Sequence, residues 1–487
     1  MQGPRKNLSR RRFLELTGAS LGMATLAACG STPPPSGSSN PTQAPAPPAA
    51  AGGTATAAPA PPAAAPEPTP GIRQAASGRD TIIEVWYPYG GTASTTLQQY
   101  WEAYEKQNTK VGIKAVYAAN DLSTNAKLFT AIASGRPPDV SWVDGPQVAE
   151  WAARNALEPL DARIAQSGFG EDDFWAPSWE QNSYNGKVWA LTYSSDPNFG
   201  FFWNKDVFKD AGLDSETPPK TIAEMDEMND KIAVVQGNRI DRLGLIPWTV
   251  YGSSNSLFTW GWAFGGEFYD PDARKITAND EKVVDALDWM VSYAKKYNPE
   301  RVSGFQAGFG TGEQNPFYVG KIAMAPFGPW ELSGLKQYAP ELKYGITFLP
   351  TGPNGAPPKS SWVGGWCVGL PRGAKQTDAG FEFIDWLTTS DEATTIQGNA
   401  FTGFPGFKNS PYYETVQKSA ELKPFYDILV ATKHQRPVMP AQAFYTGALA
   451  TAVDAAIFGQ QSSKQALDTA TSTTQKELDR ILKEGVS

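Results

Sequence analysis

The sequence predicts an α/β protein built from repeated strand–helix units. Between residues 81 and 152, three short segments rich in β-branched and aromatic residues alternate with segments whose apolar residues recur every three or four positions. Because such alternation is typical of strands that return to one sheet in the same direction, we expect a largely parallel sheet. The chain has 487 residues, which is too many for one ordinary domain, so a second unit is expected.

The predicted strands are an apolar run at Thr81–Tyr87, an alternating segment at Val111–Tyr117, and the segment Pro138–Asp144, which comprises a third strand and its exit loop. A segment with helical periodicity follows each of them. Ligands of such sheets lie beyond the carboxyl ends of the strands. The residues at these ends are Trp86, Tyr87, Tyr89, Trp142 and Asp144.

Residues 1–28 are expected to be an export signal. Ser9–Leu14 matches the twin-arginine export pattern, and Leu14–Ala28 is too short and too weakly apolar for a permanent membrane helix. Leu26–Gly30 resembles the lipobox of bacterial lipoproteins, in which Cys29 would carry the lipid. We therefore expect a mature chain that begins at Cys29 and is lipid-anchored to the cell membrane on its extracytoplasmic side.

Residues 29–79 are expected to be a disordered tether. Pro, Ala, Thr, Ser and Gly dominate this stretch, and such a sequence cannot bury a core. The globular part is expected to begin at Asp80.

The composition argues against nucleic acid and draws attention to the aromatic residues. The net charge is −8, and no basic run follows the signal region, so a nucleic-acid partner is not expected. The chain contains 16 tryptophans and 18 tyrosines. Rings exposed in a cleft can hold sugars, whose C–H faces stack on them, although at least half of these rings should be in cores.

The sequence offers little for catalysis. It has one histidine, His434, which we interpret as an incidental residue near a surface loop. One His and two Cys cannot supply a zinc site of the usual kind, and no nucleophile elbow or Walker phosphate loop is found. Cys367 has no partner once Cys29 is lipidated, and is expected to be a small buried apolar residue. We predict no catalytic residue, no metal and no cofactor.

The stretch Gly186–Leu213 is the basis of a family resemblance. A polar loop, Ser194–Asn198, precedes an apolar run, Phe199–Trp203, and a helix with Asn204 as its cap and Gly212 at its end. This pattern resembles the place where extracellular solute-binding proteins of ABC transporters cross from one lobe to the other.

Further segments are similar to elements of the sugar-binding, maltose-binding-protein-like branch, family 1. The similar segments are Ala133–Val140, Ala156–Asp161, Phe317–Met324, Gly328–Leu332, Trp362–Trp366 and Ala452–Leu467. Three departures are Asn155-Ala156 for a usual Gly, Ile222 for a usual Trp, and Phe404–Phe407 without its usual Arg. The resemblance covers about Asp80–Lys483.

The resemblance implies a two-lobed periplasmic-binding-protein fold, type II-like, with a hinge of multiple strand crossovers. Ser194–Asn198 would be the first crossing, and Trp362–Trp366 the return. Lobe 1 would comprise residues 80–196 plus 367–405, and lobe 2 residues 197–366 plus 406–487.

The implied function is capture of a sugar or oligosaccharide by lobe closure, followed by delivery to the ABC permease; the protein is expected to be a monomer. Rings would hold the sugar faces, while carboxylates and an Arg take the hydroxyls. We expect Trp86 and Trp330 to face one cleft with Asp196 near its floor. The predicted ligand-binding residues are Trp86, Tyr89, Trp142, Asp144, Asp196, Trp260, Trp262, Glu267, Trp330, Trp366, Arg436 and Tyr445.

Three alternatives stay open. A polyamine fits aromatic plus acidic residues through cation–π contact, and a glycerol phosphate or a peptide would be another solute of the same fold. A secreted carbohydrate-active enzyme would release new reducing ends from oligosaccharides. A structural surface lipoprotein would need no cleft at all.

Overall fold

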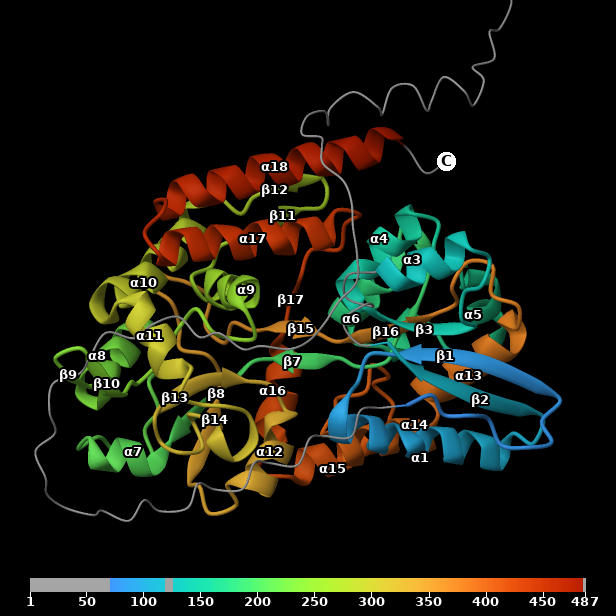
Figure 1. Cartoon of the computed structure of the whole chain (residues 1–487), viewed down its shortest axis with the longest axis horizontal. Helices are drawn as coiled ribbons and strands as arrows, with labels where there is room; N and C mark the ends of the chain where they lie inside the picture. Colours follow the sequence, from blue (N-terminus) through green and yellow to red (C-terminus); the bar gives the residue numbers. More distant parts are fainter. Residues whose placement is uncertain (1–70, 119–125, 485–487) are drawn as a thin grey trace, which may run out of the picture. The chain divides into compact units, whose positions relative to one another are not determined.

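The computed structural model describes residues 71–118 and 126–484. The predicted signal peptide, Cys29 and the tether as far as residue 70 lie outside the described residues. The described part has two lobes, each with its own sheet, joined by strands that cross between them (Figure 1). This arrangement confirms the predicted α/β, two-lobed architecture.

The first lobe contains a five-stranded sheet in the order β2-β1-β3-β16-β6. Strands β1 and β2 are parallel, as are β1 and β3, whereas β16 runs antiparallel to β3 and to β6. The sheet is therefore parallel only where successive strand–helix units build it, and β16 enters from the other lobe in the opposite direction. Its strands are β1 (Thr81–Tyr87), β2 (Val111–Tyr117), β3 (Val140–Asp144), β6 (Leu191–Thr192) and β16 (Trp366–Gly369).

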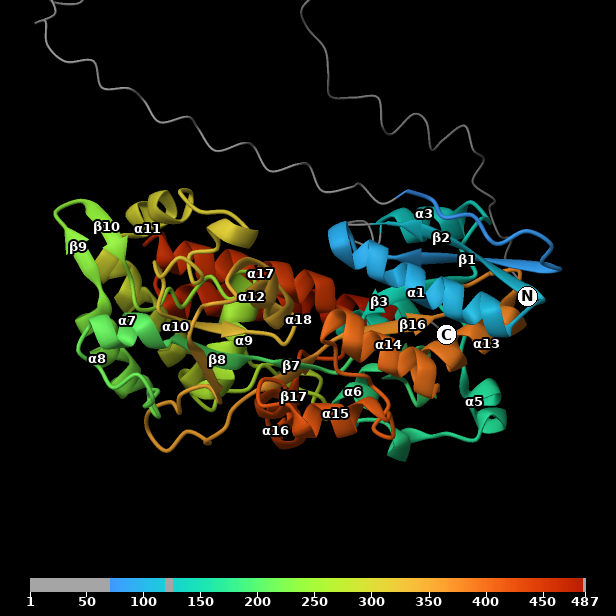
Figure 2. The ribbon, with the colours of Figure 1, turned by 90° about the horizontal axis from the view of Figure 1, so that it is seen from below.

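Helices cover both faces of this sheet (Figures 1 and 2). The apolar faces of α1 and α13 pack on it, with Trp101 of α1 and Phe383 of α13 fully buried in one core with Trp142 of β3. The helices of this lobe are α1 (Gly91–Gln107), α3 (Ala126–Ala133), α4 (Val148–Ala153), α5 (Asp161–Ser167), α6 (Ala176–Gln181), α13 (Thr377–Thr389) and α14 (Asp391–Phe401), with 3-10 turns η1 (Gly145–Gln147) and η2 (Glu171–Asp173) and a hairpin of β4 (Ser183–Tyr184) and β5 (Lys187–Val188).

The second lobe is organised around strand β8. All five residues of β8 are buried, and it pairs antiparallel with β13 on one side and β14 on the other. Asn204 then caps α7 by accepting a hydrogen bond from Val207 N, as predicted. The strands of this lobe are β8 (Gly200–Asn204), β13 (Met324–Phe327), β14 (Tyr344–Thr347), β9 (Val234–Gln236), β10 (Arg239–Arg242), β11 (Tyr269–Asp270) and β12 (Lys275–Ile276).

A helical layer packs around α9 in this lobe, and Trp260 of α9 is fully buried there. The predicted amphipathic helix is α10, capped by Asp280, with Leu287 and Met290 in the core. The helices are α7 (Lys205–Asp210), α8 (Ile222–Ile232), α9 (Ser253–Ala263), α10 (Glu281–Tyr297), α11 (Pro299–Gln306), α12 (Glu331–Tyr338), α15 (Tyr412–Lys418), α16 (Lys423–Ala431), α17 (Gln442–Ile457) and α18 (Ser463–Glu484), with the 3-10 turn η3 (Gly312–Gln314).

Three strands cross between the lobes and form one small sheet in the order β17-β15-β7. Its strands are β7 (Asp196–Asn198), antiparallel to β15 (Trp362–Gly364), which is parallel to β17 (His434–Gln435). The first two are the predicted outward and return crossings. The third was not predicted: it has two residues, and His434 was assigned to a surface loop.

The packed region begins earlier than the expected Asp80. Arg73 forms a bridge with Ala115 beside β2, and its guanidinium makes an ion pair with Glu105 at 2.6 Å. Glu105 is nearly buried and also accepts from Ala76 N and Ile113 N. An acidic side chain buried in the first lobe thus holds the chain from Arg73 onward.

The crossing sheet depends on a glycine. Gly365, between β15 and β16, has φ +127°, and a Cβ there would stand 1.9 Å from the carbonyl oxygen of Ser194. We predict that Gly365→Ala lowers the free energy of unfolding by about 2 kcal/mol or more, because it adds backbone strain and a clash with rigid main chain. Urea denaturation of the full chain measures this.

The matched control is Gly447→Ala in α17, where a Cβ meets nothing within 4 Å. Alanine in a helix interior should leave stability unchanged or raise it by up to about 1 kcal/mol. Equal stability of the two variants would show that the close approach at Gly365 does not constrain the crossing.

Candidate functional site

A cavity of about 330 Å³ lies where the crossing strand β7 meets the first lobe. Its lining comes from five places in the chain: the end of β1, the segment entering β7, the start of β16, the end of α14, and the turn before α12. The lining residues are Tyr89, Tyr193, Ser194, Asp196, Trp330, Trp366, Gln397, Phe401, Thr402 and Gly403. We refer to it as the Asp196 pocket.

Aromatic rings form much of its wall. The Tyr89 ring lies 5.7 Å from Trp366 at 64° and 5.8 Å from Phe401, measured between ring centroids. The Tyr193 side chain is fixed by a hydrogen bond between its hydroxyl and that of Tyr100, with 2.9 Å between the two oxygens. Trp330 belongs to the second lobe. The pocket therefore has ring faces from both lobes, which suits a ligand with apolar C–H faces.

The carboxylate of Asp196 is the charged group of the pocket. Ser194 Oγ donates to Asp196 Oδ2 at 3.2 Å, and the same hydroxyl oxygen accepts from Trp366 N at 3.0 Å. Burial raises the pKa of Asp196 to about 7; the hydrogen bond from Ser194 opposes this shift, and the negative charge of Asp144 adds to it. No Lys or Arg lines the pocket within the described residues. The carboxylate has spare acceptor capacity and no lining cation beside it.

Gln397 supplies an amide that has no partner. Its side chain is 2% exposed, and neither Oε1 nor Nε2 has a hydrogen-bond partner among residues 71–118 and 126–484. A buried unsatisfied polar group costs roughly 1–3 kcal/mol, so an amide left in this state beside a cavity points to a ligand or water that completes it.

Two of the predicted ligand-binding residues form an ion pair with each other. Arg436 Nη2 donates to Asp144 Oδ1 at 2.6 Å, and both side chains are largely buried. The guanidinium also lies 5.6 Å from the centroid of the Trp362 ring. This pair ties the end of β3 to the residue that follows β17, and neither residue lines the pocket.

Four of the predicted ligand-binding residues are brought together at the Asp196 pocket: Tyr89, Asp196, Trp330 and Trp366. Trp86 does not line this pocket. Its indole donates to Glu84 Oε1 at 2.7 Å, and Lys127 lies over its ring.

Three other predicted residues are packed in cores. Trp142 is fully buried and contacts Tyr193 edge-on at 5.5 Å, so it supports the pocket wall from behind. Trp260 is fully buried in the second lobe and donates to Pro247 O. Tyr445, also fully buried, donates its hydroxyl proton to Phe268 O at 2.8 Å. Full burial leaves these side chains no surface for a ligand.

Trp262 and Glu267 line a separate cavity of about 460 Å³ beside β17. The Trp262 ring stacks on His434 with 5.2 Å between centroids, and His434 Nδ1 lies 3.8 Å from Glu267 Oε1. Burial lowers the pKa of His434, and the positive charge of Lys433 lowers it further. The histidine is thus a packed part of the third crossing.

Sequence reasoning missed several lining residues. Ser194 stood in the polar loop that was singled out, but it was not chosen as a ligand contact. Gln397, Phe401 and Thr402 gave no signal, because a glutamine within a helix and a threonine after it are ordinary. Thr402 Oγ1 donates to Pro329 O at 2.9 Å and so connects the end of α14 to the turn that carries Trp330.

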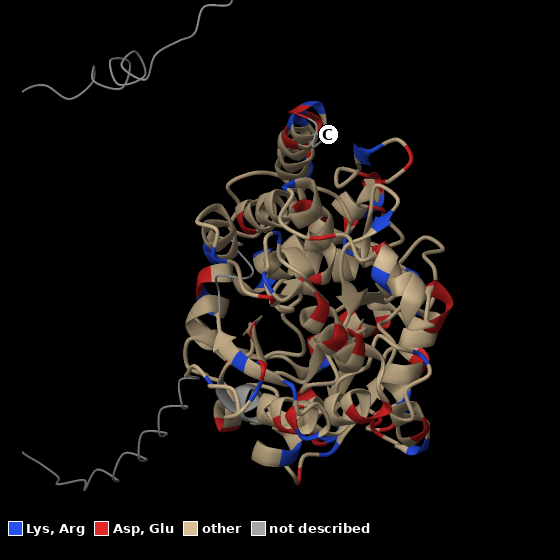
Figure 3. Cartoon of the chain, turned by 90° about the vertical axis from the view of Figure 1, so that its right-hand side faces the viewer, with Lys and Arg blue, Asp and Glu red and all other residues tan. Residues whose placement is uncertain are grey.

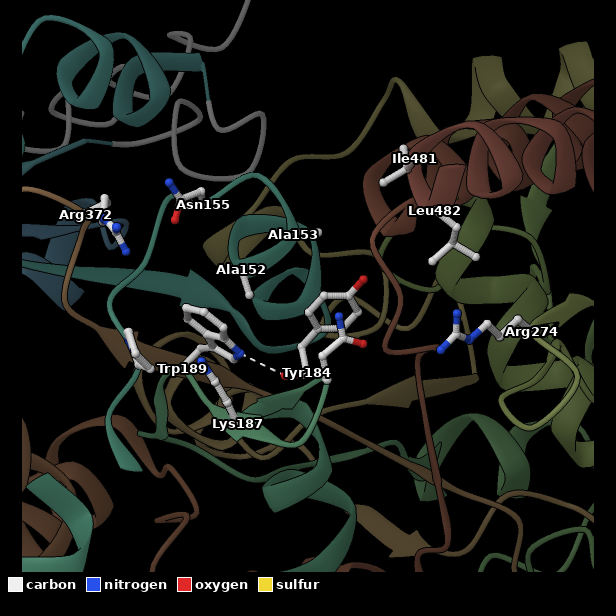
Figure 4. A pocket seen from close by; sticks show the side chains of 12 residues that line it. Ala152, Ala153, Asn155, Tyr184, Lys187, Trp189, Arg274, Arg372, Ile481 and Leu482 are labelled. Atoms are coloured by element: carbon white, nitrogen blue, oxygen red, sulfur yellow. Dashed lines mark hydrogen bonds between the residues drawn. The ribbon is translucent and has the colours of Figure 1, made fainter. Parts of the chain in front are cut away.

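A larger cavity of about 500 Å³ lies between α4, the β4–β5 hairpin and the end of α18 (Figure 4). Lys187, Arg274 and Arg372 line it, with no carboxylate among its described lining residues. Figure 4 shows Arg274 and Arg372 on opposite sides, and the Trp189 indole donating to Tyr184 O. Arg372 is already paired with Glu158, whose Oε1 lies 3.4 Å from Arg372 Nε. Lys187 and Arg274 are the other two lining cations.

Other kinds of site find little support in the described ranges. No cluster of three or more His, Cys, Asp or Glu able to hold a metal ion is found in residues 71–118 and 126–484. Among the same residues, no helix combines the length and apolar character needed to span a bilayer. On the face drawn in Figure 3, positive and negative residues are interspersed.

Comparisons with known proteins agree on one family. The family model described as "Bacterial extracellular solute-binding protein" matches residues 90–394. The chain is similar to the sn-glycerol-3-phosphate-binding periplasmic protein UgpB of Pectobacterium atrosepticum, with 24% identity over 82% of this chain and 91% of that protein.

Solved structures of similar fold carry sugars. CpMnBP1 with mannobiose bound superposes with a TM-score of 0.73 at 26% identity, over 81% of this chain and 100% of that chain. Maltose-bound MalE3 of T. maritima superposes with a TM-score of 0.65 at 22% identity, over 82% of this chain and 100% of that chain.

The raised pKa of Asp196 predicts a pH-dependent stability. An unfolded aspartate has a pKa near 3.9, so between about pH 4 and pH 7 the folded state keeps a proton that the unfolded state has lost. This contribution to the free energy of unfolding therefore falls as pH rises through that window, by up to roughly 1.4 kcal/mol per pH unit.

Asp196→Asn should remove that slope. The measurement is urea denaturation of both chains at several pH values, taken as the difference between variant and unaltered chain, with Asp272→Asn at an exposed position as control. A difference that does not vary with pH would contradict a raised pKa at Asp196.

Proposed function

The chain belongs to the family of bacterial extracellular solute-binding proteins, and on this premise we propose that it captures a sugar or oligosaccharide in the Asp196 pocket. The protein is the substrate-binding component of an importer, and the ligand it captures would be delivered to the membrane permease of an ABC transporter.

The observation that carries the ligand class is the combination of Asp196 with the unpaired amide of Gln397. The carboxylate accepts hydrogen bonds, whereas the amide both donates and accepts. A hydroxyl group is a donor and an acceptor at once, so neighbouring hydroxyls can satisfy both side chains. The rings of Tyr89, Trp330 and Trp366 offer faces for the C–H surface of a sugar.

A polyamine is the first alternative, and it fits less well. Its ammonium groups donate only, so they could satisfy Asp196 and the amide oxygen of Gln397. The Nε2 group of Gln397 would stay buried without an acceptor, at a cost of roughly 1–3 kcal/mol.

An anionic ligand is the second alternative, since the relative from Pectobacterium atrosepticum is named for sn-glycerol 3-phosphate. Recognition of a phosphate usually uses Arg, Lys or several backbone N–H groups. Among the described residues, none that lines the Asp196 pocket is a Lys or Arg. Arg436 is paired with Asp144, and ionised Asp196 would repel the anion.

The mechanism would be hinge closure of the two lobes about the crossing sheet. The proposed lobes are residues 80–196 plus 367–405 and residues 197–366 plus 406–487, with the first extended back to Arg73, which bridges to Ala115 and pairs with Glu105. Trp330 comes from one and Tyr89 from the other, so a ligand that contacts both rings favours the closed form. Closure removes water, and each ligand hydrogen bond then replaces a group that would otherwise be buried and unpaired.

The cellular setting is proposed from the sequence. Residues 1–28 would direct export through the twin-arginine route, Cys29 would carry the lipid, and the stretch to residue 70 would tether the lobes outside the membrane. The protein would act as an extracytoplasmic, lipid-anchored monomer. The family consists of binding proteins, and we propose no catalytic step or cofactor.

We predict that neutral oligosaccharides stabilise the full chain in a thermal-unfolding screen, and that putrescine, spermidine and sn-glycerol 3-phosphate do not. A ligand present at a hundred times its dissociation constant adds about 2.7 kcal/mol to stability. If only the polyamines or only the phosphate raise the transition, the ligand class is wrong.

Gln397→Met sharpens the test in the same screen. Because methionine fills the space without an unpaired amide, the unliganded protein should be as stable or more stable, while affinity for the stabilising sugar falls by about tenfold or more. Gln166→Met, at an exposed position, should change neither quantity. An unchanged affinity of the Gln397→Met variant for the sugar would show that the amide of Gln397 does not contact the ligand.

A further inference from the structure

We propose that the ring of Trp330 is held in place by a directed chain of hydrogen bonds, in which Tyr251 and Glu331 are positioning residues for ligand binding. The chain runs from the Trp330 indole through the Tyr251 hydroxyl to the Glu331 carboxylate. The inference rests on the proposed function, because Trp330 lines the Asp196 pocket. Tyr251 and Glu331 line a separate cavity of about 360 Å³, so they act on a ligand through Trp330.

The chemistry of the three groups fixes the direction of this chain. Trp330 Nε1 donates to Tyr251 Oη at 2.8 Å, and Tyr251 Oη donates to Glu331 Oε2 at 3.4 Å. An indole N–H can only donate and an ionised carboxylate can only accept, so the hydroxyl between them must accept from one and donate to the other. The second bond is long and is therefore the weaker of the two.

The carboxylate at the end of the chain is itself held in a fixed orientation. Glu331 is the first residue of α12, and its Oε1 accepts from Tyr318 Oη at 2.7 Å and from Asn315 Nδ2 at 3.1 Å. These two donors leave Oε2 to accept from Tyr251. Because side chains of the protein occupy the carboxylate in this way, its role is to orient Tyr251 and not to contact a ligand.

Ring packing connects the position of Tyr251 to that of Trp330. The Tyr251 ring stacks on Phe199, with 5.1 Å between centroids and 15° between planes, and Phe199 is only 2% exposed. Trp330 meets both rings edge-on, at 5.3 Å from Tyr251 and 6.2 Å from Phe199. The backbone of Tyr251 has φ +50°, which is unfavourable for a residue with a side chain. The contacts of its ring and hydroxyl offset this cost.

Two further contacts confine Trp330. A Cβ on Gly328 would stand 2.2 Å from Cη2 of Trp330, so the ring lies directly against the backbone of that glycine. Thr402, in the first lobe, donates from Oγ1 to Pro329 O at 2.9 Å and so fixes the turn that carries the ring. The position of the ring is therefore set by residues of both lobes.

A ring that is already fixed loses little freedom when a ligand binds. Ordering one mobile side chain at a binding surface lowers affinity by roughly two- to tenfold, and a fixed ring avoids this loss. The single N–H of Trp330 is also taken by Tyr251, so Trp330 presents only apolar ring surface to the pocket. Hydrogen bonds to a ligand are then left to groups such as Asp196 and Gln397.

The first test needs no ligand. The full chain is labelled with fluorotryptophan, and the fluorine NMR signal of Trp330 is identified by its absence from Trp330→Phe. We expect Tyr251→Phe and Gly328→Ala each to shift or broaden this signal while most of the other tryptophan signals stay in place. Tyr269→Phe in β11 and Gly447→Ala in α17, where a Cβ meets nothing within 4 Å, should leave it unchanged. An unchanged Trp330 signal in Tyr251→Phe would overturn the proposal.

A double-variant comparison tests whether the three groups act in series. Glu331→Ala should move the Trp330 signal less than Tyr251→Phe does, because the second hydrogen bond is the weaker one. In the Tyr251→Phe background, Glu331→Ala should move the signal no further, because the hydroxyl that connects the two groups is gone. If the two changes add, Glu331 acts on Trp330 through the fold, and its place in the chain is wrong.

Calorimetry with mannobiose, mannotriose and maltose connects the ring to binding. For a sugar that binds the unaltered chain, Tyr251→Phe should lower affinity about fivefold, but less than twofold in the Trp330→Phe background. Tyr269→Phe should not change affinity. An equal loss in both backgrounds would show that Tyr251 acts independently of Trp330, and would overturn its positioning role. A chain that binds none of these sugars would count against the proposed function, and the NMR signal would still decide whether Tyr251 holds Trp330.

Discussion

The crossing sheet β17-β15-β7 is the constraint on which the rest of the structure depends. It joins two lobes whose cores are otherwise separate, and the same short strands that connect the lobes also deliver Asp196 to the pocket. Asp196 is the first residue of β7, and Trp366 begins β16 directly after β15 and Gly365. The ion pair of Asp144 with Arg436 fixes the third crossing against the first lobe. Any change in lobe orientation must therefore act on groups that line the Asp196 pocket.

The charge balance of the site follows from this arrangement. Arg436 neutralises Asp144. None of the described residues that line the pocket with Asp196 is a Lys or Arg, and burial raises the pKa of Asp196 above that of an ordinary aspartate. A ligand whose hydroxyl donates to Asp196 favours the ionised form, so binding and proton release are coupled. The unpaired amide of Gln397 adds a donor that an ammonium cannot use. In the proposed function these groups would favour neutral, hydroxylated molecules, whereas the cavity of Figure 4 is lined by Lys187, Arg274 and Arg372.

The sequence was sufficient for the architecture and for part of the site. Strand–helix alternation and the Asn204 cap are local signals, so the first sheet and the entry to the second lobe could be predicted. It was harder to predict which aromatic residues line the pocket, because the burial of a ring is decided by packing. Trp142 and Trp366 both lie on neighbouring strands, yet only Trp366 lines the pocket. Both rings lie on the same face of the sheet, because Trp366 pairs with Asp144 and Trp142 is two residues before Asp144. Trp142 is covered by Trp101 and Tyr193, and only the packing of those rings decides this. Gln397 carried no local signal, since its isolation arises only when α14 packs against α1, α13 and α15.

The most direct test of the central claim is a crystal structure of the protein with the oligosaccharide that stabilises it most. The account predicts a sugar ring against Trp330, with hydroxyls on the carboxylate of Asp196 and the amide of Gln397, and no cation in contact with the ligand. Ligand density in the cavity lined by Lys187, Arg274 and Arg372, with the Asp196 pocket holding only water, would contradict it.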